Sequence, residues 1–201
     1  AELDRRRATI LKSIPDHGNL TDELQAKILA ADSLTVLEDL YLPYRPKRRT
    51  RATLAKEKGL EPLAQRLWEQ GEGDPAAEAA AYVDPGKELP SVNDVLAGAR
   101  DIMAEWVSED QRARARLRAL FLEKGTFQSA VIPGKEAEGS KFADYFAWKE
   151  PVAMAPSHRI LAMRRGEKEE ILTFRVLVPE DEAVRILEPL FVKRTKAASQ
   201  Q

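Results

Sequence analysis

The chain has 201 residues, of which 43% are hydrophobic, and its 32 lysines and arginines nearly balance 33 aspartates and glutamates. This length allows one sizeable domain or two small ones, and the hydrophobic content is enough for a packed core, which excludes wholesale disorder. Because there is no cysteine and only two histidines, disulfides, thiolate metal sites and cysteine nucleophiles are excluded, and a histidine-rich metal site is not expected.

Short amphipathic helices are predicted for the first part of the chain. A helix over 2–14 is followed by one that Thr21 caps and by a third at about 33–40. Residues 41–50 contain two prolines, which favour an extended loop. Helix then resumes near residue 52, and residues 71–90 form a connector.

The clearest helical pattern covers residues 92–107, where apolar side chains recur with a period of 3.6 over four turns. Ser91 precedes it as a cap. Ser108, with Gln111 three residues later, is a capping box for a second helix at about 109–123. Gly125 is then predicted to end this second helix in a left-handed conformation.

After residue 125 the pattern changes to short strands, predicted at 127–132 and 170–178. Between them we expect a surface loop at 133–141 and a short helix from Ser157 that Gly166 closes, and a last helix begins at Pro179. The predicted fold class is therefore mainly α, a multi-helix bundle of helix-turn-helix-like character with a small mixed α/β portion at its C-terminal end. We expect residues 1–125 to form the helical domain, with 126–201 as a mixed extension on the same core.

Charge is unevenly distributed along the chain. Residues 41–60 carry seven basic and one acidic side chain, whereas residues 61–110 carry three basic and twelve acidic ones. Such blocks create local fields that the near-neutral total conceals.

The densest cationic stretch forms the candidate binding site, which consists of Tyr44, Arg45, Lys47, Arg48, Arg49 and Arg51. One interpretation is that its arginines pair with the acidic block at 61–110 or with a neighbouring domain, since the planar guanidinium suits carboxylates. The other is that the cations contact nucleic-acid phosphates while Tyr41 and Tyr44 stack on bases. A second basic element, Arg112 to Arg118 at every second residue, is interpreted as solvated side chains or as side chains whose stems lie along the edge of the core.

No catalytic constellation is recognisable. Phosphate-binding glycine loops and serine-hydrolase elbows are absent, and the carboxylates lie at predicted turns and helix starts rather than in the converging arrangement of a metal-dependent nuclease. His158 follows a predicted cap and is interpreted as structural. We therefore predict a protein that is not an enzyme and needs no cofactor or metal.

No apolar run approaches the roughly 18 residues of a membrane helix. The chain begins Ala-Glu-Leu-Asp, which is neither a methionine start nor a signal peptide. We expect a cytoplasmic protein without a membrane partner, and a piece of a longer polypeptide.

Four strings of the sequence are distinctive. Residues 37–64 read LEDLYLPYRPKRRTRATLAKEKGLEPLA, residues 134–136 read GKE, residues 139–146 read GSKFADYF and residues 156–166 read PSHRILAMRRG. These strings resemble the Tex family of bacterial transcription accessory proteins. The resemblance implies a fragment from the amino-terminal half of a longer protein related to a eukaryotic elongation factor. Family members continue into a nuclease-like domain without established activity, helix-hairpin-helix elements and an OB-fold that binds RNA.

Two functions follow from the residues and the resemblance together. The first is a non-catalytic helical scaffold segment of a factor that binds RNA or DNA, with the basic stretch used for phosphate contacts or interdomain docking. The alternative is a protein-interaction module that binds the transcription machinery through the acidic face of 61–110.

Overall fold

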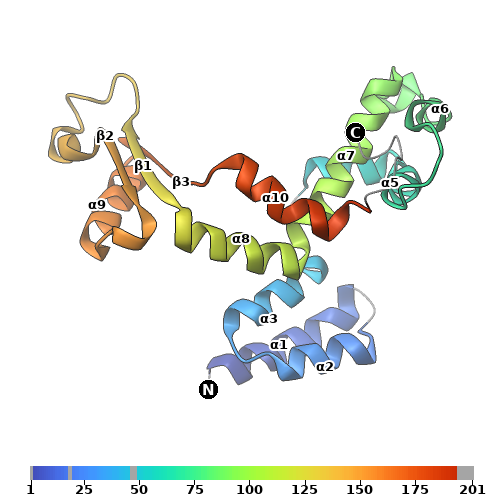
Figure 1. The fold of residues 1–201 in the computed structure, drawn as a ribbon, viewed down its shortest axis with the longest axis horizontal. Coiled ribbons are helices and arrows are strands. Elements are labelled where there is room, and N and C mark those ends of the chain that lie inside the picture. Colours follow the sequence, from blue (N-terminus) through green and yellow to red (C-terminus); the bar gives the residue numbers. More distant parts are fainter. Residues whose placement is uncertain (1, 18–19, 46–48, 194–201) are drawn as a thin grey trace. The chain divides into compact units, whose positions relative to one another are not determined.

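The computed structural model describes residues 2–17, 20–45 and 49–193 (Figure 1). The chain divides into two compact units, one formed by Ala1–Arg114 with Pro189–Gln201 and the other by Ala115–Glu188. The α-helices are α1 Glu2–His17, α2 Asp22–Ala30, α3 Leu34–Tyr41, α4 Arg51–Glu57, α5 Glu61–Trp68, α6 Pro75–Ala80, α7 Val92–Glu109, α8 Gln111–Lys124, α9 Ser157–Lys168 and α10 Glu180–Phe191. Short 3-10 helices are η1 Leu42–Tyr44, η2 Pro85–Lys87, η3 Ser140–Tyr145 and η4 Val152–Met154, and the strands are β1 Thr126–Val131, β2 Ala147–Pro151 and β3 Leu172–Leu177.

The predicted fold class is confirmed. The described part of the first unit is built from helices, whereas the second unit combines helices with a three-stranded antiparallel sheet. The protein is thus mainly α with a small mixed portion. The helix-turn-helix likeness stays a prediction.

The first helices pack around their own apolar core in the first unit. Thr21 caps α2 as predicted, because its hydroxyl accepts a hydrogen bond from the backbone N–H of Leu24 at 3.2 Å. The fully buried side chains of this cluster include Ile10, Ile28 and Leu37. At about 25 cal/mol per Å² of apolar surface, their removal from water is the main force that holds these short helices together.

A second apolar cluster holds α4 to α7 together. Leu60 and Ile102 are fully buried there. A Cβ atom at Gly98 of α7 would lie 2.4 Å from a methyl carbon of Leu60, so this glycine permits the close approach of the two segments. The predicted cap of α7 is confirmed, since the hydroxyl of Ser91 accepts a hydrogen bond from the N–H of Asp94 at 3.3 Å.

The predicted capping box at the start of α8 is wrong. The carboxylate of Asp110 accepts hydrogen bonds from the backbone N–H groups of Arg112 at 2.8 Å and Ala113 at 3.0 Å. The hydroxyl of Ser108 instead donates to the carbonyl oxygen of Glu105 at 2.9 Å, within α7. Asp110 is the better cap because its carboxylate accepts two backbone hydrogen bonds, and because its negative charge is stabilised by the positive end of the helix dipole.

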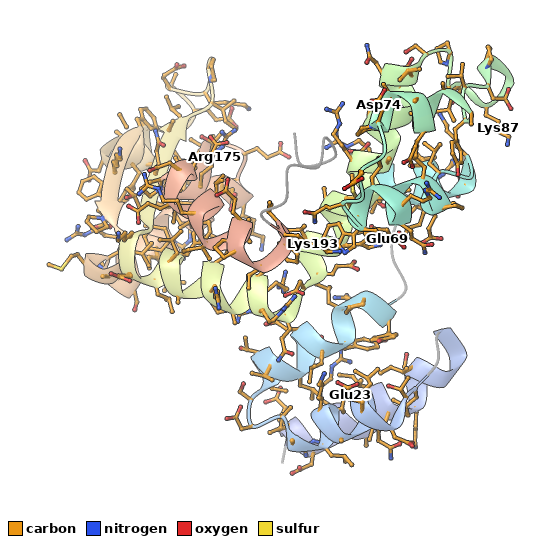
Figure 2. The ribbon with its side chains drawn as sticks, turned by 45° about the vertical axis from the view of Figure 1, so that its right-hand side comes forward. Glu23, Glu69, Asp74, Lys87, Arg175 and Lys193 are labelled. Carbon is orange, nitrogen blue, oxygen red and sulfur yellow. The ribbon has the colours of Figure 1, made fainter. Side chains whose placement is uncertain are left out.

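The end of α10 returns the chain to the first unit. Gln70, in a left-handed conformation with φ of 53°, donates from its side-chain amide to the carbonyl of Phe191 at 2.7 Å and accepts from the N–H of Lys193 at 2.9 Å. The ammonium group of Lys193 donates to the carbonyl of Glu69 at 2.8 Å (Figure 2). The centres of the Phe191 and Trp68 rings also lie 5.6 Å apart. Residues 189–193 are therefore anchored on the end of α5.

In the second unit, β1 is the central strand and pairs antiparallel with β2 and with β3. The predicted strands at 127–132 and 170–178 correspond to β1 and β3. Strand β2 was not predicted, because Ala-Trp-Lys-Glu-Pro lacks a β-branched or alternating pattern. The residues of β2 have little intrinsic preference for a strand, and the segment is extended because it pairs with β1.

Two glycines of the second unit have other roles than predicted. Gly125 does not adopt a left-handed conformation; a Cβ there would lie 2.1 Å from the carbonyl oxygen of Phe121, so the backbone itself leaves no room for a side chain. Gly166 does not end α9, which continues to Lys168. It is buried where the helix meets β3, and a Cβ atom would lie 2.5 Å from a methyl carbon of Leu172.

Candidate nucleic-acid interface

The predicted basic site lies between η1 and α4. Tyr44 ends η1, Arg45 follows it, and Arg51 is the first residue of α4. Lys47 and Arg48 lie outside the described residues. Helix α4 begins here because the hydroxyl of Thr50 accepts a hydrogen bond from the N–H of Thr53 at 3.0 Å. The predicted extended loop is thus shortened by a 3-10 turn at one end and by a capped helix at the other.

The two tyrosines before the basic residues belong to the core of α1 to α3. Tyr41 is buried, and its hydroxyl lies 2.8 Å from that of Ser13. The guanidinium of Arg6 stands 5.5 Å from the centre of the Tyr41 ring. Because the Tyr41 ring is buried and also contacts Arg6, it is not accessible for stacking on bases. Tyr44 is half-buried against the same core.

The described arginines of the site are exposed and have surface carboxylates as neighbours. Arg49 donates to Glu57 at 2.9 Å, yet its side chain is 70% exposed. The Nε atom of Arg51 is 3.9 Å from a carboxylate oxygen of Asp101, and the Arg51 side chain is 87% exposed. Exposed pairs of this kind contribute about 0–1 kcal/mol, so they leave the guanidinium groups available to a stronger anion.

Lys56, which the sequence analysis did not single out, makes an ionic contact between α4 and the acidic block that is less exposed than that of Arg51. The ammonium group of Lys56 lies 3.4 Å from the carboxylate of Glu105, whose side chain is only 11% exposed, and 3.6 Å from that of Glu61. The hydroxyl of Thr50 also donates to Glu105 at 3.1 Å. Lys56 gave no signal in the sequence beyond its place in the basic block, because its partner is 49 residues away.

Arg45 contributes to the electrostatics of α3. The pKa of Glu38 lies below its ordinary value, chiefly because the Arg6 guanidinium donates hydrogen bonds to it, one of them at 3.0 Å, and also because Arg6 and Arg45 are positively charged; partial burial opposes this. A carboxylate with a depressed pKa stabilises the fold above its unfolded pKa, and this stabilisation is lost as the pH falls through its folded pKa.

We therefore expect Glu38→Gln to flatten the fall in unfolding free energy between about pH 5 and pH 3. Urea titrations at several pH values measure this. Glu136→Gln is the matched control, because Glu136 is exposed and has no ion pair among the described residues. Equal pH dependence of Glu38→Gln and the unaltered chain would contradict the assigned role of Glu38.

The second basic element is partly used in ion pairs. On α8, Arg112 lies 2.9 Å from the capping Asp110, and the Nε of Arg114 donates to the buried Asp39 at 2.6 Å. The interpretation of these arginines as merely solvated is wrong for Arg114, because a carboxylate that is 4% exposed needs charged partners. This pairing joins residues 75 positions apart and was not visible in the sequence.

Other kinds of site were searched for in the described part of the chain. No group of three or more histidine, aspartate or glutamate side chains is placed there to hold a metal ion. His158 is exposed near the start of α9. None of the helices in the described ranges is long and apolar enough to cross a membrane.

Comparison with known proteins identifies relatives of this chain. The chain is 44% identical over 181 residues to the transcriptional accessory protein Tex of Neisseria gonorrhoeae, which covers 90% of the chain and 24% of that protein. It is 48% identical over 171 residues to the protein YhgF of Escherichia coli, covering 85% and 22%, respectively. It is 25% identical over 179 residues to the S1 RNA-binding domain-containing protein 1 of Homo sapiens, covering 85% and 18%.

The chain thus spans about a quarter of the length of these bacterial relatives. The family model described as Tex central region-like matches residues 70–201, which is more than half of the chain. The chain therefore belongs to the Tex central region-like family, in agreement with the resemblance seen in its sequence.

Proposed function

We propose that this chain is a non-catalytic helical scaffold segment of a transcription accessory factor, and that its basic segment, residues 45–51, contacts nucleic-acid phosphates. The observation that carries the proposal is the exposure of Arg49 and Arg51, whose carboxylate neighbours lie at the surface. A phosphate offers an arginine two charge-assisted hydrogen bonds and releases condensed counterions on binding.

The described residues on either side of positions 46–48 are held by neighbouring elements. Thr50 caps α4 and so sets the position of Arg51, while Tyr44 is held against the core of α1 to α3 on the other side of the segment. Arg51 is therefore held at a capped helix start, which reduces the entropy that its backbone loses when the side chain binds an anion.

The names of the relatives agree with such a role for the longer protein. One is called a transcriptional accessory protein and another an S1 RNA-binding domain-containing protein. Nucleic-acid binding by the full-length protein, and any contact with the transcription machinery, are part of the proposal. The non-catalytic assignment is supported by the absence of cysteine and the presence of only two histidines in the whole sequence.

The test is a double charge reversal, Arg48→Glu with Arg49→Glu. If the segment neutralises about four phosphates, the unaltered chain should bind duplex DNA with a log–log salt slope of roughly −3.6, and the variant should lose most of this binding. The melting temperature should change little, because the Arg49 pair is exposed and contributes at most about 1 kcal/mol. Fluorescence anisotropy and thermal melting measure the two quantities.

The matched control reverses two arginines that are also exposed and ion-paired, Arg66→Glu with Arg185→Glu. It changes the net charge equally and should retain most of the binding. A large drop in melting temperature for the Arg48 and Arg49 variant, with binding unaltered, would instead favour internal pairing. Salt-independent or absent binding by the unaltered chain would contradict phosphate contact and leave the protein-interaction alternative.

A further inference from the structure

The sheet of the second unit has one covered and one open face. Side chains alternate along the strands, so residues paired directly across them share a face. On the covered face, Glu150 of β2 accepts a hydrogen bond from Arg159 of α9 at 2.6 Å, and Leu172 of β3 meets Gly166 of the same helix. Helix α9 therefore occupies this face.

The opposite face carries a row of three polar side chains in register. Gln128 of the central strand is paired with Lys149 of β2 on one side and with Arg175 of β3 on the other. All three residues are exposed, and Arg175 is labelled in Figure 2. Neither Lys149 nor Arg175 has an ion-pair partner among the described residues, which include the whole second unit.

The surroundings of this row carry no negative charge. The neighbouring rows on the same face are Ala130, Ala147 and Thr173 on one side and Thr126, Pro151 and Leu177 on the other. The only carboxylate on the three strands is that of Glu150, which lies on the covered face. The open face thus offers two cations that have no ion pair among the described residues, and no carboxylate of the strands lies beside them.

We propose that this open face binds the phosphate backbone of a single-stranded nucleic acid. Lys149 and Arg175 would contact separate phosphates, and Gln128 between them would hydrogen-bond to the backbone. The two cations stand two strand spacings apart, roughly 10 Å, which one flexible strand can bridge. This surface belongs to the second unit, whereas the basic segment at 45–51 belongs to the first.

The chemistry of the face selects this ligand over others. Cores of protein interfaces are enriched in aromatic residues and depleted in charge, and the row of Lys149, Gln128 and Arg175 has the opposite composition. Base-specific reading of a duplex needs an element that enters a groove, and this sheet face presents none. Without an aromatic ring on the face, bases have no stacking platform, so binding is to the backbone and independent of sequence.

The experiment titrates the 201-residue chain into a fluorescein-labelled oligothymidylate of about 12 nucleotides at several salt concentrations. In the variant Lys149→Gln with Arg175→Gln, Kd should rise about tenfold, and the log–log salt slope should lose about 1.4, the value for two contacts on a single strand. Thermal melting should be unaltered, because both side chains are exposed. Amide chemical shifts of the unaltered chain should change at β1, β2 and β3 when the oligonucleotide binds.

The matched control is Arg165→Gln with Lys168→Gln on α9, which removes two exposed cations of the same unit that have no ion pair among the described residues. Its salt slope should stay close to that of the unaltered chain. Equal effects of both variants would show that binding depends only on the net charge of the chain, and would overturn the proposal. Unaltered Kd and slope in the variant of Lys149 and Arg175 would also overturn it and leave the face to a protein partner.

The Arg48→Glu with Arg49→Glu variant, tested on the same oligonucleotide, separates this inference from the proposed function. A loss of binding in that variant alone overturns the open-face site and supports the basic segment. A loss in the Lys149 and Arg175 variant alone does the reverse. Absence of binding by the unaltered chain overturns the open-face site.

Discussion

Replacing Arg159 by leucine should lower the free energy of unfolding by about 3 kcal/mol, because it leaves the buried carboxylate of Glu150 without its counter-ion. Glu150 is 8% exposed, and one of its oxygens accepts from Arg159 at 2.6 Å. Its other oxygen has no hydrogen-bond partner among the described residues, so little else compensates the charge. The guanidinium also stands 5.3 Å from the centre of the Trp148 ring, and this attraction is lost as well.

Urea denaturation of Arg159→Leu measures the loss. The matched variant adds Glu150→Leu, which removes the stranded charge and should recover much of the stability, since a buried pair can often be replaced by apolar side chains at small cost. The double-mutant cycle then gives the coupling between the two groups. A loss below about 1 kcal/mol for Arg159→Leu alone would contradict the assigned role of the pair.

Gly166→Ala should destabilise the protein by about 2 kcal/mol, although the same change at an exposed helix position stabilises by about 1 kcal/mol. Gly166 lies within α9, and its new methyl group would approach the Cδ1 and Cγ atoms of Leu172 to 2.5 and 2.8 Å. Leu172 is 1% exposed, and buried side chains are close-packed, so a shift of Leu172 would disturb its other neighbours. The sign of the effect therefore reports whether the helix and β3 pack as closely as described.

Thermal and urea unfolding of Gly166→Ala give the sign directly. Gly71→Ala is the control, because a Cβ at Gly71 meets no atom within 4 Å. Leu172→Val in the Gly166→Ala background removes a clashing methyl carbon and should restore part of the loss. Stabilisation by Gly166→Ala, as at an exposed position, would show that α9 and β3 are not in close contact.

Local signals in the sequence predicted much of the fold. The hydroxyl of Thr21 and that of Ser91 cap the helices that follow them, as expected, because capping involves residues only three positions apart. The prediction of Ser108 as the next cap failed because the carboxylate of Asp110, two residues later, accepts the backbone hydrogen bonds instead. Strand β2 escaped prediction for the opposite reason, since it depends on its neighbour β1 and not on its own residues.

The candidate site was predictable as a stretch of charge but not as a set of contacts. Arg49 pairs with Glu57, eight positions away, whereas Arg51 approaches Asp101 and Lys56 reaches Glu105 across about fifty positions. Pairing over such separations depends on how helices pack, which periodicity along one helix does not specify. The open sheet face was hidden for the same reason, because Lys149 lies on the strand that was not predicted.

The anchoring of residues 189–193 by Gln70 bears on how the protein is made. Phe191 and Lys193 complete the packing around α5, but they follow the whole second unit in the chain. A ribosome synthesises the chain from its amino terminus, and domains generally fold as they emerge. The contacts of residues 189–193 with the end of α5 can therefore form only after translation has passed residue 193, by which time the inserted sheet has already had the opportunity to form.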